Sequence, residues 1–242
     1  MEIFEKLDLA MKEEWNKILD ENAFMKLILD GHKDRRLFAF YLCEVYNMTK
    51  HSSITQALVV KHLSKPSPKN IQYMQYCLRH ALEEVGHEQM ALHDLKSLGA
   101  NLTNETMPAP SASTEAFSNY LYNLVETGAN PVARLGYTYW AESSYEFLGP
   151  MAFSAIQNMK LEAKNITFLS EHGDIDQDHF SDVKKILTSI IKTEEDAKAV
   201  ETVLRDTIRL TGDVLSDCYN NYQNLVNNKE SRYSALNDIK NV

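Results

Sequence analysis

The sequence predicts an all-α protein, folded as a single domain that is a bundle of seven or eight helices. Three observations support this prediction. Apolar residues recur at helical spacing along most of the 242 residues. Glycine and proline are scarce, with 8 and 6 residues, whereas an all-β protein needs many turns. Several periodic segments exceed about 25 residues, which is long enough for a helix to cross a whole domain.

The first half of the chain divides into four expected helices. One covers residues 2–21, and a short second helix ends at Gly31. A long third helix is expected from about residue 32 to residue 63, where a proline-rich segment stops it. Ser67, which is followed by proline, has the character of an N-cap for the fourth helix, and Gly99 has that of its C-cap. The fourth helix is therefore expected to run unbroken between them.

The second half begins with a surface loop and continues with four more helices. Gly149 and Pro150 are expected to kink the second of these, and Thr193 is expected to cap the last. The helical pattern then ends, which predicts one domain over residues 1–228 and a loose tail over residues 229–242. The loop covers residues 100–113, and the helices cover about 114–128, 130–163, 168–192 and 193–228.

Composition and charge narrow the class of partner. The net charge of −9 argues against nucleic acid and against anionic membranes, because both attract basic surfaces. No apolar run approaches the roughly 20 residues of a membrane span, and the N-terminal segment lacks the apolar core of a signal peptide. The three cysteines form no CxxC pair and are odd in number, which favours reduced thiols over a disulfide framework. These features predict a cytoplasmic protein that binds neither nucleic acid nor a membrane.

The expected helix between Ser67 and Gly99 carries two stripes at about 100° per residue. One stripe is apolar, and the other is polar only in its middle, which is unusual for a solvated face. Within that middle, Glu84 and His87 lie three residues apart and therefore side by side. Glu-x-x-His on a bundle helix is how diiron proteins present a carboxylate and an imidazole, although a solvated helix also carries such pairs by chance. The apolar stripe is Ile71, Met74, Leu78, Leu82, Val85 and Leu92, and the polar-centred stripe is Tyr73, Cys77, His80, Glu84, His87, Ala91 and Leu98.

A second group of candidate metal ligands lies in the segment FLSEHGDIDQDHF. His172, Asp176 and His179 are spaced i, i+4 and i+7, which places them within about 60° on one helix face. The alternative is a polar helix start, where acidic side chains interact favourably with the helix dipole. Two histidines that frame an aspartate on a single face favour a metal site.

Two further carboxylates lie in apolar surroundings. Glu44 is part of FAFYLCEVY, and Glu142 lies among aromatic residues with Glu146 one turn later as its rival. A buried carboxylate is costly unless it is paired or bound to a metal. Together these motifs supply four carboxylates and three imidazoles on four helices. That set suits iron or manganese better than structural zinc, and two divalent ions would compensate its charge.

The segment EEVGHE, followed by FLSEHGDIDQDHF, resembles the heme-oxygenase-like diiron oxidases and oxygenases, whose fold is shared with heme oxygenase and the thiaminase TenA. That family carries a Glu on its first core helix, Glu-x-x-His on the next, a Glu on a later one and His-x3-Asp-x2-His on the last. The segment YTYWAESSYEFLG also resembles the Tyr-x-x-Glu-Gly-Ser helix of heme oxygenases, which favours Glu142 over Glu146. The metal ligands that the resemblance implies are Glu44, Glu84, His87, Glu142, His172, Asp176 and His179.

The resemblance, which covers roughly residues 30–190, implies a non-heme diiron oxidase or oxygenase. Two iron ions, with manganese as an alternative at one position, would activate O2 to oxidise an amine, an amino-acid-like molecule or a fatty acid. The reaction would be an N-oxygenation or an oxidative C–C cleavage, and a homodimer is compatible with the fold. His80 is expected to support a ligand or to line the pocket. The other expected wall residues are Tyr41, Tyr73, Tyr137, Tyr145 and Phe168.

The sequence is also compatible with two other functions. One is a metal-independent enzyme of the same fold, similar to TenA or PQQ synthase, for which Cys77 is the candidate nucleophile. The other is an all-α interaction module with a vestigial site. Iron uptake separates the diiron enzyme from the interaction module, and replacement of Cys77 separates it from a thiaminase.

Overall fold

The computed structural model describes residues 3–65, 67–229 and 231–241, and of residues 172–178 it describes only the backbone. Within these ranges the chain contains helices and no strand, as predicted, and none of the helices is long and apolar enough to span a membrane. The α-helices are α1 Ile3–Glu21, α2 Ala23–Leu29, α3 Arg35–Thr49, α4 Ser52–Leu58, α5 Pro68–Glu83, α6 Glu88–Leu98, α7 Ala112–Thr127, α8 Leu135–Met159, α9 Thr167–Ile190 and α10 Glu194–Val226. Short 3-10 helices are η1 Val59–His62, η2 Ala163–Asn165 and η3 Ser234–Asp238.

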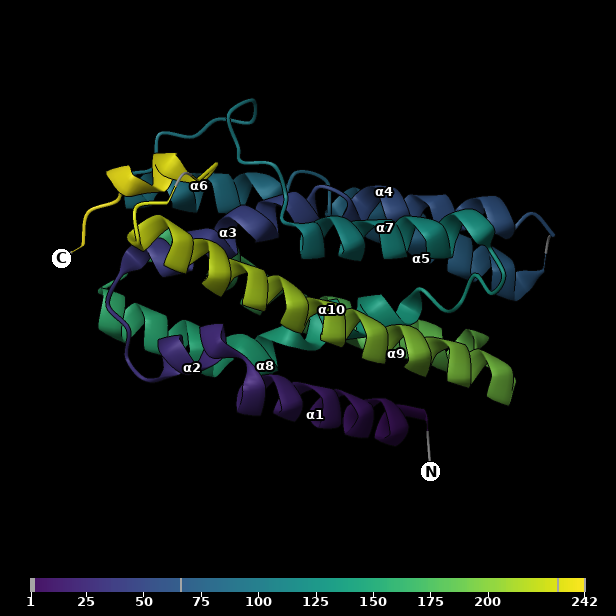
Figure 1. Ribbon diagram of the computed structural model, residues 1–242. Helices are drawn as coiled ribbons and strands as arrows, with labels where there is room; N and C mark the ends of the chain where they lie inside the picture. The colour runs from purple at the N-terminus through teal and green to yellow at the C-terminus, as the bar shows by residue number, and fades with distance from the viewer. Residues whose placement is uncertain (1–2, 66, 230, 242) are drawn as a thin grey trace.

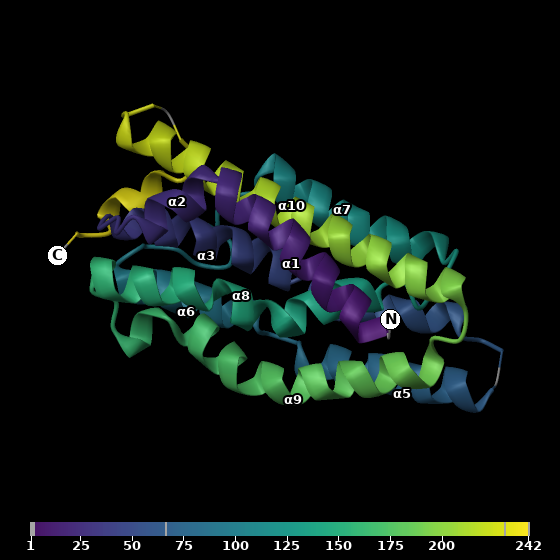
Figure 2. The ribbon, with the colours of Figure 1, turned by 90° about the horizontal axis from the view of Figure 1, so that it is seen from below.

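The helices form one elongated bundle in which α10, the longest of those described, runs along the whole length (Figure 1). α10 packs against α1, α3, α7 and α8. α8 also contacts α9, and α9 lies beside both α5 and α6. Seen from below, α5 and α9 run side by side along one edge (Figure 2). Side chains from α5, α8 and α9 can therefore meet inside the bundle.

Local capping signals set several helix ends as predicted. Ser67 caps α5 by accepting a hydrogen bond from the backbone N–H of Asn70 at 3.1 Å. Thr193 caps α10 in the same way, with Asp196 as the donor at 3.0 Å. Gly99 ends α6 with a φ of 107°, a left-handed conformation that favours glycine. These three predictions are confirmed.

Two helices that were expected to be continuous are broken. The segment 32–63 is divided into α3, α4 and η1. α5 and α6 are separated by the turn 84–87, in which Gly86 has a φ of 90°. That left-handed conformation turns the chain out of the helix, and residues with a Cβ rarely adopt it. Glu84 and His87 therefore lie in a turn between two helices rather than on one helix face.

The two stripes predicted for residues 68–99 differ in burial. Every member of the polar-centred stripe is buried, from Tyr73 at one end to Leu98 at the other. Four members of the apolar stripe are instead exposed, namely Ile71, Leu78, Leu82 and Val85. The polar middle, and not the wholly apolar stripe, therefore faces the interior of the bundle.

The C-terminal segment is packed against the bundle. Tyr233 and Leu236 are buried, and Leu236 lies in η3. The hydroxyl of Tyr233 donates a hydrogen bond to the carboxylate of Glu44 at 2.5 Å. The centroid of its ring lies 4.7 Å from the centroid of the Phe40 ring. The prediction of a loose tail over residues 229–242 is corrected, because a few aperiodic apolar residues suffice to hold this segment on the core.

Candidate metal centre

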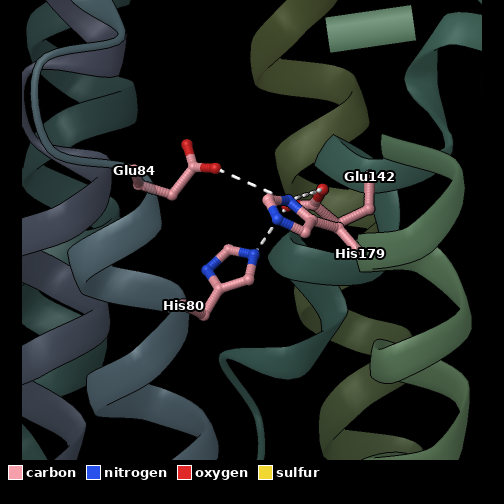
Figure 3. A group of neighbouring side chains, drawn as sticks. All are labelled: His80, Glu84, Glu142 and His179. Carbon is pink, nitrogen blue, oxygen red and sulfur yellow. Dashed lines mark hydrogen bonds and ion pairs between the residues drawn. The ribbon is translucent and has the colours of Figure 1, made fainter. Parts of the chain in front are cut away.

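Four side chains from three parts of the bundle converge in its interior. Figure 3 shows His80, Glu84, Glu142 and His179 pointing toward one another. His80 lies in the last turn of α5, Glu84 is the C-cap of that helix, Glu142 lies within α8 and His179 lies within α9. Each residue offers one ligand atom, and these four atoms all lie within 4.8 Å of one another. We call these four residues the metal group.

The end of α5 explains how this helix delivers two of the four residues. His80 and Glu84 are four residues apart, so they project from the same side of the helix one turn from each other. The turn at Gly86 stops α5 directly after Glu84. His87 then begins the approach to α6, with its Nδ1 atom 3.4 Å from Oε2 of Glu84. A third imidazole is thereby placed beside the metal group.

Glu142 links the two histidines of the metal group. Nε2 of His80 lies 2.9 Å from Oε1 of Glu142, at hydrogen-bond distance. Nδ1 of His179 lies 3.3 Å from Oε2 of Glu142 and 3.8 Å from Oε1 of Glu84. Glu142 is only 3% exposed, so these contacts are made away from bulk water. The carboxylates and imidazoles thus form one connected, buried cluster.

The cluster shifts the ionisation of its members. Burial alone would raise the pKa of Glu142, but contacts with His179 and His80 hold it at about 2. The contact with Glu142 in turn raises the pKa of His179 against the effect of burial. The contact with Glu84 likewise raises the pKa of His87. The raised pKa values of His179 and His87 favour protonated imidazoles beside the buried carboxylates, and a bound divalent cation would take over that role and displace the protons.

Unpartnered polar atoms show that the metal group fits a cation. Six buried side-chain N or O atoms of the described residues lack a hydrogen-bond partner, and three belong to this group. They are Nδ1 of His80, Oε2 of Glu142 and Nδ1 of His179, of which the last two face each other at 3.3 Å as an ion pair without forming a hydrogen bond. A buried polar atom with no partner, such as Nδ1 of His80, costs on the order of 1–3 kcal/mol unless it binds something else. Two carboxylates and two imidazoles are a donor set that suits iron, so the residues present fit an iron ion.

The remaining predicted ligands are Glu44, His172 and Asp176. Contrary to the prediction, Glu44 does not join the metal group. Its carboxylate accepts hydrogen bonds from the backbone N–H of Ser111 at 3.0 Å and from the hydroxyl of Tyr233 at 2.5 Å. These partners account for its burial without a metal. His172 and Asp176 belong to α9, but their side chains fall outside the described residues.

A cavity of about 210 Å³ adjoins the metal group. His80, Glu84 and Glu142 form part of its wall, and most of the remaining wall is apolar or aromatic. Tyr73, which was expected in the wall, instead donates a hydrogen bond to the carbonyl oxygen of Pro131 at 2.9 Å. The predicted wall residues that do line the cavity are Tyr41, Tyr137, Tyr145 and Phe168. The cavity can hold a small organic molecule beside the metal group.

Cys77 lacks the properties of an activated nucleophile. Its side chain is fully buried, and it is not part of the cavity wall. Burial raises the pKa of its thiol to about 11. Reactive cysteines are partly accessible and have lowered pKa values. These properties argue against the thiaminase-like alternative.

Comparison with known protein families shows which family this chain resembles in sequence. The family described as "Iron-containing redox enzyme" matches residues 39–211, a range that includes all four residues of the metal group. The chain belongs to this family. Membership of the iron-containing redox enzymes supports an oxidoreductase and agrees with a donor set suited to iron. No curated protein sequence matches the chain.

Solved structures give the fold of this family member. A protein of unknown function with a heme oxygenase-like fold from Shewanella denitrificans is 35% identical, with a TM-score of 0.87 over 95% of this chain and 97% of that one. A TenA homologue from Pseudomonas syringae is 11% identical, with a TM-score of 0.72 over 91% and 96% of the two chains. Heme oxygenase-1 from Synechocystis, in complex with heme, is 14% identical, with a TM-score of 0.70 over 94% and 96%. The predicted heme-oxygenase-like and TenA-like fold is confirmed.

Two features of the site were not predicted. His80 was expected only to support a ligand or to line the pocket, yet it belongs to the metal group. Its position one turn before Glu84 on the polar-centred stripe was the available signal. The second feature is Asp94 of α6, whose carboxylate accepts hydrogen bonds from the backbone N–H groups of Thr167 and Phe168, both at 2.9 Å. These bonds hold the start of α9, and no local sequence signal reports so distant a contact.

Proposed function

We propose that the protein is a non-heme diiron oxidase or oxygenase that oxidises a small organic substrate with O2. The observation that carries the proposal is the metal group itself. It contains two buried carboxylates and two imidazoles, three of whose polar atoms form no hydrogen bond, in a chain that belongs to an iron-containing redox family. A purely structural cluster would be expected to satisfy these atoms within the protein.

The orientation of Glu84 supports a second ion. Its Oε1 atom faces Nδ1 of His179 at 3.8 Å, whereas its Oε2 atom faces Nδ1 of His87 at 3.4 Å. A carboxylate whose two oxygens face different imidazoles would be able to take part in holding two cations. We assign one ion to the metal group and a second to Glu84 and His87. His172 and Asp176, which the family resemblance implies as further ligands, have side chains outside the described residues.

The protein would supply binding, orientation and a dry site. Iron in this centre would provide electrons for the reduction of O2 as the substrate is oxidised. The contact between His80 and Glu142 fixes one carboxylate, so its second oxygen keeps a constant direction. The apolar wall of the adjoining cavity excludes water from the site and holds the substrate beside it.

Oxygen consumption after anaerobic loading with Fe(II) tests the proposal. The loaded protein is mixed with O2 in the presence of candidate acids, amines or amino acids, and visible absorbance is followed together with the oxygen concentration. We expect rapid O2 uptake that one class of substrate accelerates, and loss of this uptake in Glu142→Gln. Glu146→Gln is the matched control, because Glu146 lies one turn further along α8 and outside the metal group. Uptake no faster than that of free Fe(II) would refute the proposal.

A further inference from the structure

A buried arginine without a counter-ion forms part of the wall of the cavity. Arg134 precedes the first residue of α8 and is only 2% exposed. No described carboxylate forms an ion pair with it, although the described residues contain many such pairs on other cations. A buried charge is expensive unless it is compensated, so this arginine needs an explanation.

The protein holds the guanidinium of Arg134 in place with neutral groups alone. Its two terminal nitrogens donate four hydrogen bonds, and the ring of Tyr137 lies 4.9 Å away. The remaining N–H, on Nε, is buried and has no acceptor. The acceptors are Oε1 of Gln56, Oγ1 of Thr138, the carbonyl oxygen of Ser52 and Oγ1 of Thr55. The side chain is therefore fixed in position, but its positive charge is not neutralised.

We propose that Arg134 binds the carboxylate of the substrate, which makes the substrate a carboxylic acid with an apolar body. This inference rests on the proposed function, because it takes the cavity beside the metal group as the substrate site. A carboxylate supplies the single negative charge and the acceptor that Arg134 lacks. A phosphate monoester would bring up to two charges, and among the described residues the cavity wall contains no lysine and no second arginine to compensate the additional one. The apolar and aromatic wall fits the remainder of such an acid.

The spacing along α8 separates the carboxylate from the oxidised atom. Arg134, Thr138 and Glu142 follow one another at four-residue intervals, and all three line the cavity. Eight residues of helix span about 12 Å. A substrate held by Arg134 at one end therefore reaches the metal group only through a chain of several bonds. The acid group serves as the anchor, and a distant atom is presented for oxidation.

Ligand binding by the metal-free protein tests this inference independently of iron. Trp140 lines the cavity, so its fluorescence reports occupancy. The probes are the straight-chain acids from butanoate to decanoate, each paired with its primary amide. We expect the preferred acid to bind about 10- to 100-fold more tightly than its amide, as for other hydrogen bonds to a charged group. Arg134→Gln should reduce this preference to near unity, and Arg134→Lys should retain part of it.

A matched variant separates charge from packing. Leu148 lies in the same wall without a charge, so Leu148→Ala should weaken acid and amide equally. The inference is overturned if the wild-type protein binds acid and amide alike, if no acid binds, or if folded Arg134→Gln keeps the preference. If acids bind through Arg134 but iron is not taken up, the proposed function fails and the anion site stands. If iron is taken up but no acid binds, the anion site at Arg134 is refuted and the proposed function stands.

Discussion

Replacement of Asp94 should loosen the helix that carries His179. α9 begins at Thr167, and the residue before it, Ile166, has no side chain that can cap a helix. Asp94, which is fully buried in α6, supplies the cap from another helix. Its carboxylate accepts bonds from the N–H and the hydroxyl of Thr167, at 2.9 and 2.6 Å, and from the N–H of Phe168 at 2.9 Å.

The size of the effect follows from these bonds. Asp94→Ala removes a cap, which costs about 0.5–2 kcal/mol, and leaves two backbone N–H groups without acceptors, at about 1–3 kcal/mol each if fully buried. Thr167 and Phe168 are only partly buried, so water recovers some of this loss. We expect a total of about 2–4 kcal/mol in the free energy of unfolding. Burial raises the pKa of Asp94, so its charge is already penalised and the neutral Asp94→Asn should lose less.

Urea unfolding together with Fe(II) titration measures both consequences. Asp94→Ala should lower the affinity for iron as well as the stability, because α9 positions His179. Thr193→Ala is the matched control, since it removes the cap of α10, a helix that contributes nothing to the metal group. It should cost about 1 kcal/mol and leave iron binding unchanged. The reasoning is wrong if Asp94→Ala is no more destabilising than Thr193→Ala, or if its iron affinity equals that of the wild type.

Two further predictions concern the frame of the bundle. A Cβ on Gly136 would lie 2.2 Å from the carbonyl oxygen of Val200 in α10, so Gly136→Ala should lower the free energy of unfolding by at least about 1–3 kcal/mol. A Cβ on Gly149 in the same helix would meet nothing within 4 Å, so Gly149→Ala should raise it by up to about 1 kcal/mol. Equal melting temperatures of the two variants would contradict this. A hydrogen bond from Arg209 lowers the pKa of Glu14 from 4.5 to about 2, although burial alone would raise it. This shift corresponds to a contribution of at most about 3 kcal/mol to the free energy of unfolding. Because Arg209 is exposed to solvent, which screens the interaction, we expect about 1–2 kcal/mol. Because the pKa of Glu14 is lower in the folded than in the unfolded protein, this stabilisation is complete above about pH 4.5 and is lost as the pH falls toward 2. Urea unfolding should therefore show that Glu14→Gln is less stable than the wild type at pH 7 but equally stable near pH 2.

The sequence contains enough local information to predict the helices and the inward face of α5. Apolar periodicity and the caps at Ser67 and Thr193 depend on neighbouring residues, and the structure confirms them. The burial of the polar-centred stripe was also predictable, because Cys77 and Ala91 frame its polar middle. These features share one property, which is that residues within a few turns determine them.

The features that were missed depend on backbone conformation or on distant contacts. A glycine within a helical pattern does not reveal that Gly86 takes a positive φ and ends α5. Glu44 resembles a buried ligand until Tyr233, almost two hundred residues away, is found to donate to it. Arg134 likewise gives no signal in the sequence, because its lack of a counter-ion is apparent only from the residues that surround it in space.

The affinity for Fe(II), measured anaerobically by equilibrium dialysis with metal analysis, tests the central claim most directly. The wild-type protein should bind two ions per chain, one held by the metal group and one by Glu84 and His87. Glu142→Gln removes one negative charge and one ligand from the metal group, and should weaken binding by at least about 10- to 100-fold. Glu146→Gln should bind iron as the wild type does. Wild-type protein that takes up no iron, or Glu142→Gln that binds it with unchanged affinity, would contradict the assignment of the metal group.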